Sequence, residues 1–264
     1  MSRTLYEYVL LFFLFSTVGW LWESIACSLY KCGHLINRGF LNGPYCPIYG
    51  CGALCGILCL NRIESPVLLF LCSGFSCCTL EYITSYVMEK MFHARWWDYS
   101  DRPFNLNGRV YLNGFIAFGG ASVVLIKWLS PFVVSAMEQI PFQGLSITAY
   151  ILTVLFIVDN IVTISGFIHF DEKLKEMNLA IELAEKRQQW QSARQSVKLI
   201  INTYIGRLTL QELRILSAFP RLRSIYYNHV LMELRTALAM RSSKKASTSD
   251  NECTAPLLTR EHSA

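Results

Sequence analysis

The chain has 264 residues, of which 53% are hydrophobic and only 16% are charged, whereas a soluble globular domain carries about 25% charged residues. The charges are unevenly placed, because residues 1–170 hold nine Lys or Arg and nine Asp or Glu and have no net charge. Residues 171–264 therefore carry the whole net charge of +5. This division excludes a single soluble domain and predicts a transmembrane domain over residues 1–170, followed by a basic, water-facing tail.

Five segments of the first 170 residues are apolar enough to be considered as transmembrane helices. The second is short for a bilayer about 30 Å thick, so it is either a tilted helix that extends into its flanks or part of a re-entrant hairpin. The first contains Glu23 and lacks a cleavage site, which indicates a retained span rather than a signal peptide. We therefore predict an all-α, polytopic transmembrane helical bundle of about five spans. The predicted spans are 8–30, 47–60, 67–88, 111–129 and 145–168.

The Lys and Arg residues of the loops predict the orientation, because cytoplasmic loops carry an excess of them. With the N-terminus outside, six basic residues of the transmembrane domain fall in inner loops and three in outer loops, and all 15 of the tail fall inside. The sequence thus predicts a multi-pass protein of the cell membrane, N-out and C-in. The six inner residues are Lys31, Arg38, Lys90, Arg95, Arg102 and Arg109.

Nine of the ten cysteines lie within residues 27–78, in or beside apolar segments. Cys51, Cys55 and Cys59 recur every four residues beside Gly52 and Gly56, and small residues at this spacing let membrane helices approach closely. Metal and haem sites use CxxC pairs or CxxCH, which the sequence lacks. We interpret the cysteines as packing residues and expect neither a metal nor a cofactor.

Three carboxylates lie inside predicted spans, where an ionisable side chain costs roughly 2.5–3.5 kcal/mol and needs a partner or a purpose. Glu23, Glu81 and Asp159 precede Lys31, Lys90 and His169 by eight, nine and ten residues. At about 1.5 Å per residue, all three lie roughly 12–15 Å from the inner ends of their spans. We interpret them as a shared polar site, and the alternative is that each is a buried partner of an arginine.

The two inner loops combine Arg and Asn with aromatic and turn-forming residues, unlike ordinary solvated linkers. Irregular backbone at membrane depth is tolerated only inside protein or around a water-filled cavity. These side chains are therefore candidates for a substrate or ion pathway shared with the three acids, and the alternative is that they anchor the loops at the membrane interface. The loop candidates are Asn37, Arg38, Tyr45, Arg95, Trp97, Asp98, Tyr99, Asn107 and Arg109.

Four blocks stand out in order along this part of the chain. They are GWLWE at 19–23, NRGFLNGPYCPIYG at 37–50, EY at 81–82 and RWWDYSDRPFNLNGR at 95–109. Together they resemble the ABC-transporter type IV (CmpB) family of multi-pass membrane proteins, over roughly residues 8–130. The resemblance implies a membrane location and a permease role, and no family residue with an established catalytic or substrate role is carried over.

The sequence has no GxxxxGK[ST] phosphate loop, so a transporter built from this chain needs a separate ATPase subunit. Five spans are few for one half of a pump, which suggests a homo-oligomer. The lipid bilayer is the other expected partner, and no motif supports nucleic-acid binding.

The tail is predicted to be a cytoplasmic helical region over residues 171–241 and disordered over 242–264, which are rich in Ser, Thr and Lys. A capping box at residues 209–212 marks the start of its second helix. The tail serves either to dock a partner such as an ATPase or to rest on anionic lipid headgroups. The predicted helices cover 172–204, then from 209 to before Pro220, and 221–240.

Two functions follow from these features, a transport subunit and a membrane-embedded enzyme that acts on lipid headgroups at the inner leaflet. Transport sites often combine broken helices with intramembrane carboxylates. In the enzyme, arginines would hold a lipid phosphate and Asp98 or Glu23 would act as a general base. No HExxH or GxSxG motif is present, so no catalytic residue is assigned. A non-catalytic membrane scaffold is the third alternative.

Overall fold

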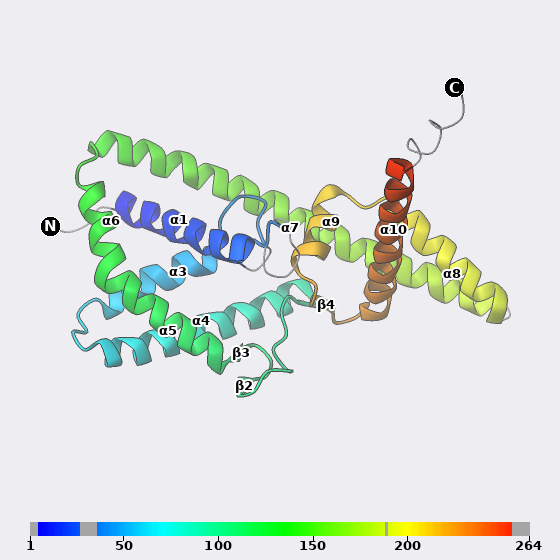
Figure 1. Ribbon diagram of the computed structural model, residues 1–264, viewed down its shortest axis with the longest axis horizontal. Coiled ribbons are helices and arrows are strands. Elements are labelled where there is room, and N and C mark those ends of the chain that lie inside the picture. Colours follow the sequence, from blue (N-terminus) through cyan, green and yellow to red (C-terminus); the bar gives the residue numbers. More distant parts are fainter. Residues whose placement is uncertain (1–4, 27–35, 188–189, 255–264) are drawn as a thin grey trace, which may run out of the picture. The chain divides into compact units, whose positions relative to one another are not determined.

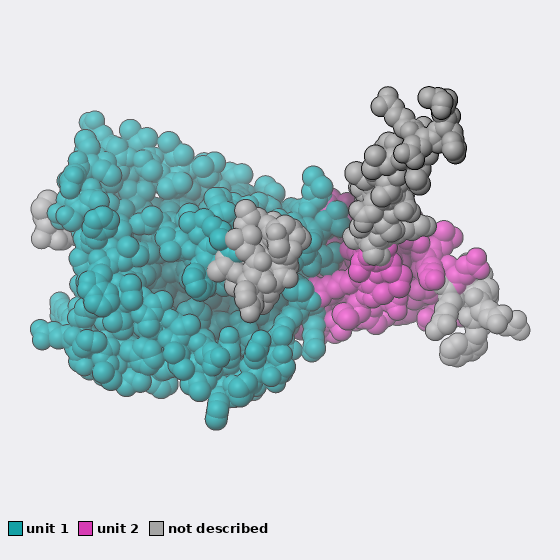
Figure 2. Space-filling view, in the orientation of Figure 1, with its two compact units in different colours: residues 1–169, 210–223 teal, residues 170–209, 224–264 magenta. Residues whose placement is uncertain are grey.

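The computed structural model describes residues 5–26, 36–187 and 190–254. The chain divides into two compact units, one of residues 1–169 and 210–223 and the other of residues 170–209 and 224–264 (Figure 2). Helices dominate both units, and strands are limited to two-residue segments in the described residues. The predicted all-α helical bundle is therefore confirmed.

Four helical segments in the described part of the chain are long and apolar enough to cross a membrane. They coincide with the first, third, fourth and fifth predicted spans, and residues 27–30 of the first predicted span lie outside the described residues. The second predicted span is a shorter apolar helix, Pro47–Leu60, below the length of about 20 residues that a full crossing needs. The four long segments are Leu5–Ile25, Pro66–Phe92, Leu112–Met137 and Phe142–Lys186.

The first unit holds the apolar helices and one short helix from the tail. Pro47 and Pro66 each open a helix, because the missing N–H of a proline costs nothing in the first turn. In chain order the helices are α1 (Leu5–Leu21), α3 (Pro47–Cys55), α4 (Pro66–Phe92), α5 (Leu112–Val124), α6 (Ser130–Met137), α7 (Phe142–Arg187, up to His169 in this unit) and α9 (Leu210–Ala218) (Figure 1).

Three of these helices run into π-helical segments, η1 (Trp22–Ala26) after α1, η2 (Gly56–Leu60) after α3 and η3 (Leu125–Leu129) after α5. The wider π turn is rare and frequently marks a functional site. Glu23 lies within η1, so this predicted membrane acid lies where the regular hydrogen bonding of α1 changes.

Within the first unit α1 packs along α3, and α4 packs along α5 (Figure 1). Close approach of α1 and α3 depends on Gly50, where a Cβ would meet the Ser16 hydroxyl and lie 2.5 Å from the backbone oxygen of Phe12. On its other side α1 contacts α7, since the rings of Phe12 and Phe13 lie 5.7 and 5.6 Å from Phe156. α1 is therefore the central helix of this group.

The connection between α4 and α5 contains β1 (Ala94–Arg95) and an antiparallel hairpin of β2 (Asn105–Leu106) and β3 (Val110–Tyr111). Asn105 pairs with Tyr111 and Leu106 with Val110. Asn107 and Gly108 turn the hairpin with φ of 53° and 65°, a left-handed conformation that these two residue types tolerate best. This hairpin places the side chains of the second predicted inner loop.

The second unit contains the end of α7, α8 (Trp190–Ile205) and α10 (Asn228–Thr254). The predicted tail helix 172–204 does not begin as a separate helix, because α7 continues from the last apolar span to Arg187 and α8 begins at Trp190. α8 ends before Gly206 and α9 begins directly after Thr209, as the sequence predicts. The third tail helix begins at Asn228 rather than 221, because β4 (Arg223–Ser224) is extended and the Ser224 hydroxyl accepts from the backbone N–H of Tyr227. α10 enters the stretch 242–264, whose last ten residues lie outside the described residues.

Candidate functional site

Asp159 on α7, one of the predicted membrane acids, accepts five hydrogen bonds. Its Oδ1 accepts from the backbone N–H of Asn42 at 3.1 Å, from the Asn42 side chain at 3.0 Å and from the Thr163 hydroxyl at 3.1 Å. Its Oδ2 accepts from the backbone N–H of Gly43 and the hydroxyl of Tyr45, both at 2.7 Å. A carboxylate offers about four lone-pair sites, so Asp159 is fully occupied in fastening the loop to α7.

Asn37 organises the start of the same loop. Its Oδ1 accepts from the Trp20 indole at 2.8 Å and from the backbone N–H of Gly39 at 3.0 Å, and its Nδ2 donates to the backbone oxygen of Asn42 at 2.9 Å. All of these partners belong to α1 or to the loop itself. The predicted pathway residue Asn37 therefore shapes the backbone.

Arg38 and an arginine of the tail complete this loop. The backbone N–H of Arg38 donates to the Ser24 hydroxyl at 3.3 Å, while its Nε has no hydrogen-bond partner among the described residues. Arg214 of α9 donates to the backbone oxygens of Gly39 at 2.7 Å and Phe40 at 3.0 Å. The first loop is thus held by α1, α7 and α9 together.

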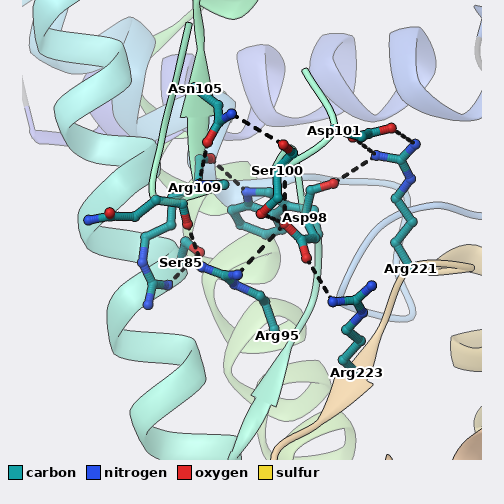
Figure 3. Close-up of polar contacts among 12 residues, drawn as sticks. Ser85, Arg95, Asp98, Ser100, Asp101, Asn105, Arg109, Arg221 and Arg223 are labelled. Carbon is teal, nitrogen blue, oxygen red and sulfur yellow. Dashed lines mark hydrogen bonds and ion pairs between the residues drawn. The ribbon is translucent and has the colours of Figure 1, made fainter. Parts of the chain in front are cut away.

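Arg109 is the most buried arginine of the second loop, with 6% of its surface exposed. Its guanidinium donates to the Ser85 hydroxyl at 2.9 Å (Figure 3). The same guanidinium pairs with Glu89 at 2.9 Å. It also lies over the rings of Tyr82 and Tyr86, at 5.6 and 5.5 Å from their centroids, where a cation is attracted to the ring face. Arg109 therefore neutralises Glu89 inside the structure.

Asp98 is buried and surrounded by donors (Figure 3). Its Oδ1 accepts from the backbone N–H and the hydroxyl of Ser100 and lies 3.7 Å from the Arg95 guanidinium. Its Oδ2 lies 3.2 Å from the Arg223 guanidinium. Arg95 also pairs with Glu89 at 3.4 Å. Burial alone would raise the pKa of Asp98, but the Ser100 hydrogen bonds and the two arginine charges outweigh it and lower that pKa. Asp98 is therefore a paired carboxylate, poorly suited to accept a proton at neutral pH.

Trp97 and Asn107 fix the hairpin. The Trp97 indole donates to the backbone oxygen of Arg109 at 3.1 Å, and the Asn107 side chain donates to the Tyr82 hydroxyl at 2.9 Å. The Arg95 guanidinium donates to the backbone oxygen of Asn107. These contacts attach the hairpin to α4.

Residues 210–223, which we call the strap, also reach the second loop. Arg221 makes two hydrogen bonds of 3.0 Å to the Asp101 carboxylate and donates to the backbone oxygen of Asp98 at 2.7 Å (Figure 3). The hydrogen bonds from Arg221 lower the pKa of Asp101. With Arg214 on the first loop and Arg221 and Arg223 on the second, the strap connects the two loops.

Glu23 and Glu81 lie in a different environment, which we call the dicarboxylate centre together with Tyr49 and Tyr99. The Tyr49 hydroxyl of α3 donates to Glu23 at 2.7 Å. Glu81 of α4 is 7% exposed, and its Oε2 has no hydrogen-bond partner among the described residues. Tyr99 of the second loop is half-buried beside both acids, and burial, then Glu81 and Glu23, raise the pKa of its phenol. The centre thus joins two carboxylates and two phenols from four segments.

The local sequence explains why these side chains meet. A Cβ on Gly19 would lie 2.6 Å from Tyr49 Cβ, so only glycine lets the Tyr49 ring lie against α1. Glu81, Ser85 and Glu89 are four residues apart and share one face of α4. The Arg109 guanidinium contacts Ser85 and Glu89, so it forms its ion pair with Glu89 and not with Glu81.

The structure therefore places the predicted candidates in three groups. The dicarboxylate centre contains Glu23, Glu81 and Tyr99. The first loop is fastened by Asp159, Tyr45 and Asn37. The remaining loop candidates, other than Arg38, pair with one another around the second loop. Several participants were absent from the prediction. They are Asn42, Tyr49, Ser85, Glu89, Thr163, Arg214, Arg221 and Arg223.

Two of the missed residues carry a signal in the sequence. Tyr49 lies four residues after Tyr45 in the same motif block, and Glu89 lies on the helical face of Glu81. The arginines of the strap carry none, because nothing local marks them as partners of loops more than 100 residues earlier. Within the described part of the chain, no group of three or more His, Cys, Asp or Glu is arranged to hold a metal ion.

A family model described as "Putative ABC-transporter type IV" matches residues 10–164. The match includes the four long apolar segments in whole or in part, both loops and the dicarboxylate centre, and it ends before the strap. No curated protein and no solved structure matches the chain significantly.

Proposed function

Because this chain belongs to the ABC-transporter type IV family, we propose that it is the membrane-spanning permease subunit of an ABC-type transporter. It is a multi-pass membrane protein, and it lacks the phosphate loop that binds ATP. A separate ATPase subunit would therefore supply the energy, and two or more copies of this chain would build the pathway. The cell membrane, with both described loops on the inner side, is the location that the basic residues favour.

The dicarboxylate centre is the observation that carries this proposal. Ionisable side chains at membrane depth are costly, and they mark ion and substrate pathways in transport proteins. Glu23 lies in the π-helical end of α1, and Tyr49 lies on the short helix α3, which fits the use of interrupted helices at transport sites.

The contacts around the second loop favour a structural role over lipid chemistry. A lipid-headgroup enzyme needs free arginines for phosphate and a carboxylate able to take a proton. Here Arg95 and Arg109 are paired with Glu89, and the lowered pKa of Asp98 disfavours proton uptake. We therefore propose transport and do not propose catalysis.

The experiment is purification of the tagged full-length chain from its own membranes in mild detergent, with ATP hydrolysis as the readout. We expect an ATPase to co-purify in a fixed ratio. Alanine in place of the phosphate-loop lysine of that ATPase should abolish hydrolysis and leave the complex intact. Recovery of the chain without any ATPase, and without solute flux after reconstitution into liposomes, would contradict the proposal.

A further inference from the structure

In the part of the chain that the structure describes, the Glu81 carboxylate is buried without a positively charged group to neutralise it. It lies on the apolar helix α4 with 7% of its surface exposed, and its buried Oε2 has no hydrogen-bond partner among the described residues. Burying a carboxylate is costly unless it is paired and hydrogen-bonded, so an unoccupied oxygen of this kind calls for a proton or a cation.

No described group that faces Glu81 carries a positive charge. Glu23 comes from η1 and repels its carboxylate, whereas the Tyr99 hydroxyl of the second loop favours the charged form, and Cys77 and Cys78 lie on its own helix. Each of these groups is either acidic or neutral, so none compensates a negative charge on Glu81. Tyr99 contributes a hydroxyl only.

The arginines of the second loop and the strap are engaged elsewhere. Arg109 pairs with Glu89, Arg95 with Glu89 and Asp98, and Arg221 with Asp101. Neither Glu81 nor Glu23 forms an ion pair within the described ranges. The described chain therefore leaves two neighbouring carboxylates without a positive charge between them.

We propose that Glu81 and Glu23 together bind one exchangeable positive charge, either a proton or a single monovalent metal ion. Two carboxylates that repel each other cannot both stay ionised cheaply, so one of them takes up a proton or the two share a cation. A divalent ion is not proposed, because the described residues contain no group of three or more His, Cys, Asp or Glu arranged to hold a metal ion. That this charge is the coupling ion of a transporter rests on the proposed function. Its binding to Glu81 and Glu23 can be measured without any transport assay.

Two features keep this charge in an ordered position. The Tyr49 hydroxyl donates to Glu23 at 2.7 Å, which leaves the Glu81 side of the pair as the side that accepts the charge. The π-helical segment η1 carries Glu23 at an interruption of α1, and interrupted helices line ion sites in transporters. The geometry therefore provides a Glu23 carboxylate held by Tyr49 and one open carboxylate oxygen, Oε2 of Glu81.

The test is the thermal unfolding of the full-length chain in lipid nanodiscs, from about pH 5 to about pH 9, in choline buffer and with Na⁺ or K⁺ at equal ionic strength. If a proton is bound, the unfolding midpoint of the wild type should fall by about 3–5 °C as the pH rises, because deprotonation leaves two carboxylates buried together. If a metal ion is bound, Na⁺ or K⁺ should raise the midpoint by a similar amount at the alkaline end.

Glu81→Gln replaces the open carboxylate by a neutral side chain of the same shape, so both dependences should disappear. Glu64→Gln, at an exposed position between α3 and α4, is the matched control and should keep the wild-type behaviour. The proposal is overturned if Glu81→Gln responds to pH and to cations as the wild type does.

Infrared spectroscopy of the wild-type protein keeps the proposal testable if Glu81→Gln does not fold. A carboxylic-acid C=O band that disappears on titration supports a bound proton, and carboxylate bands that shift with Na⁺ or K⁺ support a metal ion. Absence of both signals contradicts the proposal. These measurements involve neither an ATPase nor solute flux, so their failure is distinct from failure of the permease proposal.

Discussion

Asp159 and Glu81 are two acids at a similar predicted depth in apolar helices, but their carboxylates differ in their hydrogen-bond partners. Asp159 accepts five hydrogen bonds from residues 42–45 and from Thr163. Glu81 is buried with one oxygen lacking a hydrogen-bond partner in the described chain, and its neighbouring charge is Glu23. The same sequence signal thus marks a structural attachment in one helix and an open acid in another.

The difference comes from what reaches each carboxylate. Backbone N–H groups of an irregular loop reach Asp159, and such groups are strong, fixed donors. Glu81 faces side chains of η1, of its own helix and of the second loop, where the guanidinium of Arg109 is paired with Glu89. A carboxylate saturated by backbone holds the fold together, whereas an open one is available for a ligand.

The largest effect should come from removing the saturated carboxylate. Asp159→Asn replaces one accepting oxygen by an NH₂ group that faces donors, so at least two charge-assisted hydrogen bonds are lost. We expect a loss of stability of about 3 kcal/mol, measured as a lower thermal midpoint in detergent. Glu64→Gln serves as the exposed control. Equal midpoints for Asp159→Asn and the wild type would show that the loop does not depend on this acid.

An intermediate effect should come from the packing that brings Tyr49 to Glu23. Gly50→Ala would press a methyl group against the Phe12 backbone oxygen and the Ser16 hydroxyl, so α3 must move away from α1. Overpacking of this kind costs roughly 1–3 kcal/mol. Gly120→Ala is the control, since a Cβ there meets nothing within 4 Å. Thermal midpoints that drop equally in both variants would argue against close α1–α3 packing.

The smallest effect should come from the strap. Arg221→Ala removes the exposed pair with Asp101 and the bond to the Asp98 backbone, and amide hydrogen exchange of residues 210–223 should rise a few-fold. Arg102→Ala, exposed in the same loop, should leave the exchange unchanged. If the strap of Arg221→Ala exchanges as slowly as that of the wild type, Arg221 is not needed to keep the strap on the second loop.

The strap should also respond to acid. The pKa values of Asp98 and Asp101 are lowered in the folded protein, so the stability that these pairs add is present above the ordinary value of about 3.9 and is lost as the pH falls below it. The protection of residues 210–223, measured as the exchange rate relative to the intrinsic rate of an unprotected amide at each pH, should therefore be constant near neutral pH and fall only in strong acid. A loss of protection already near pH 6 would point to another titrating group.

Features that depend on local composition can be predicted from the sequence alone. Apolar length determined the four long helices and the short Pro47–Leu60, because burying a backbone in lipid requires a continuous helix of sufficient length. The capping box at residues 209–212 likewise marked the start of α9. The three membrane acids can also be identified from the sequence, because a charged residue within a long apolar segment is rare.

Which partner each acid has depends instead on how the helices and loops pack in three dimensions. Asp159 is bound by a loop more than 100 residues away, and Arg214 and Arg221 hold loops that precede them by more than 100 residues. Hydrogen bonds and ion pairs act over a few ångströms in space and leave no periodic trace in the chain. The separation of the saturated Asp159 from the open Glu81 therefore arises only when the helices and loops pack together.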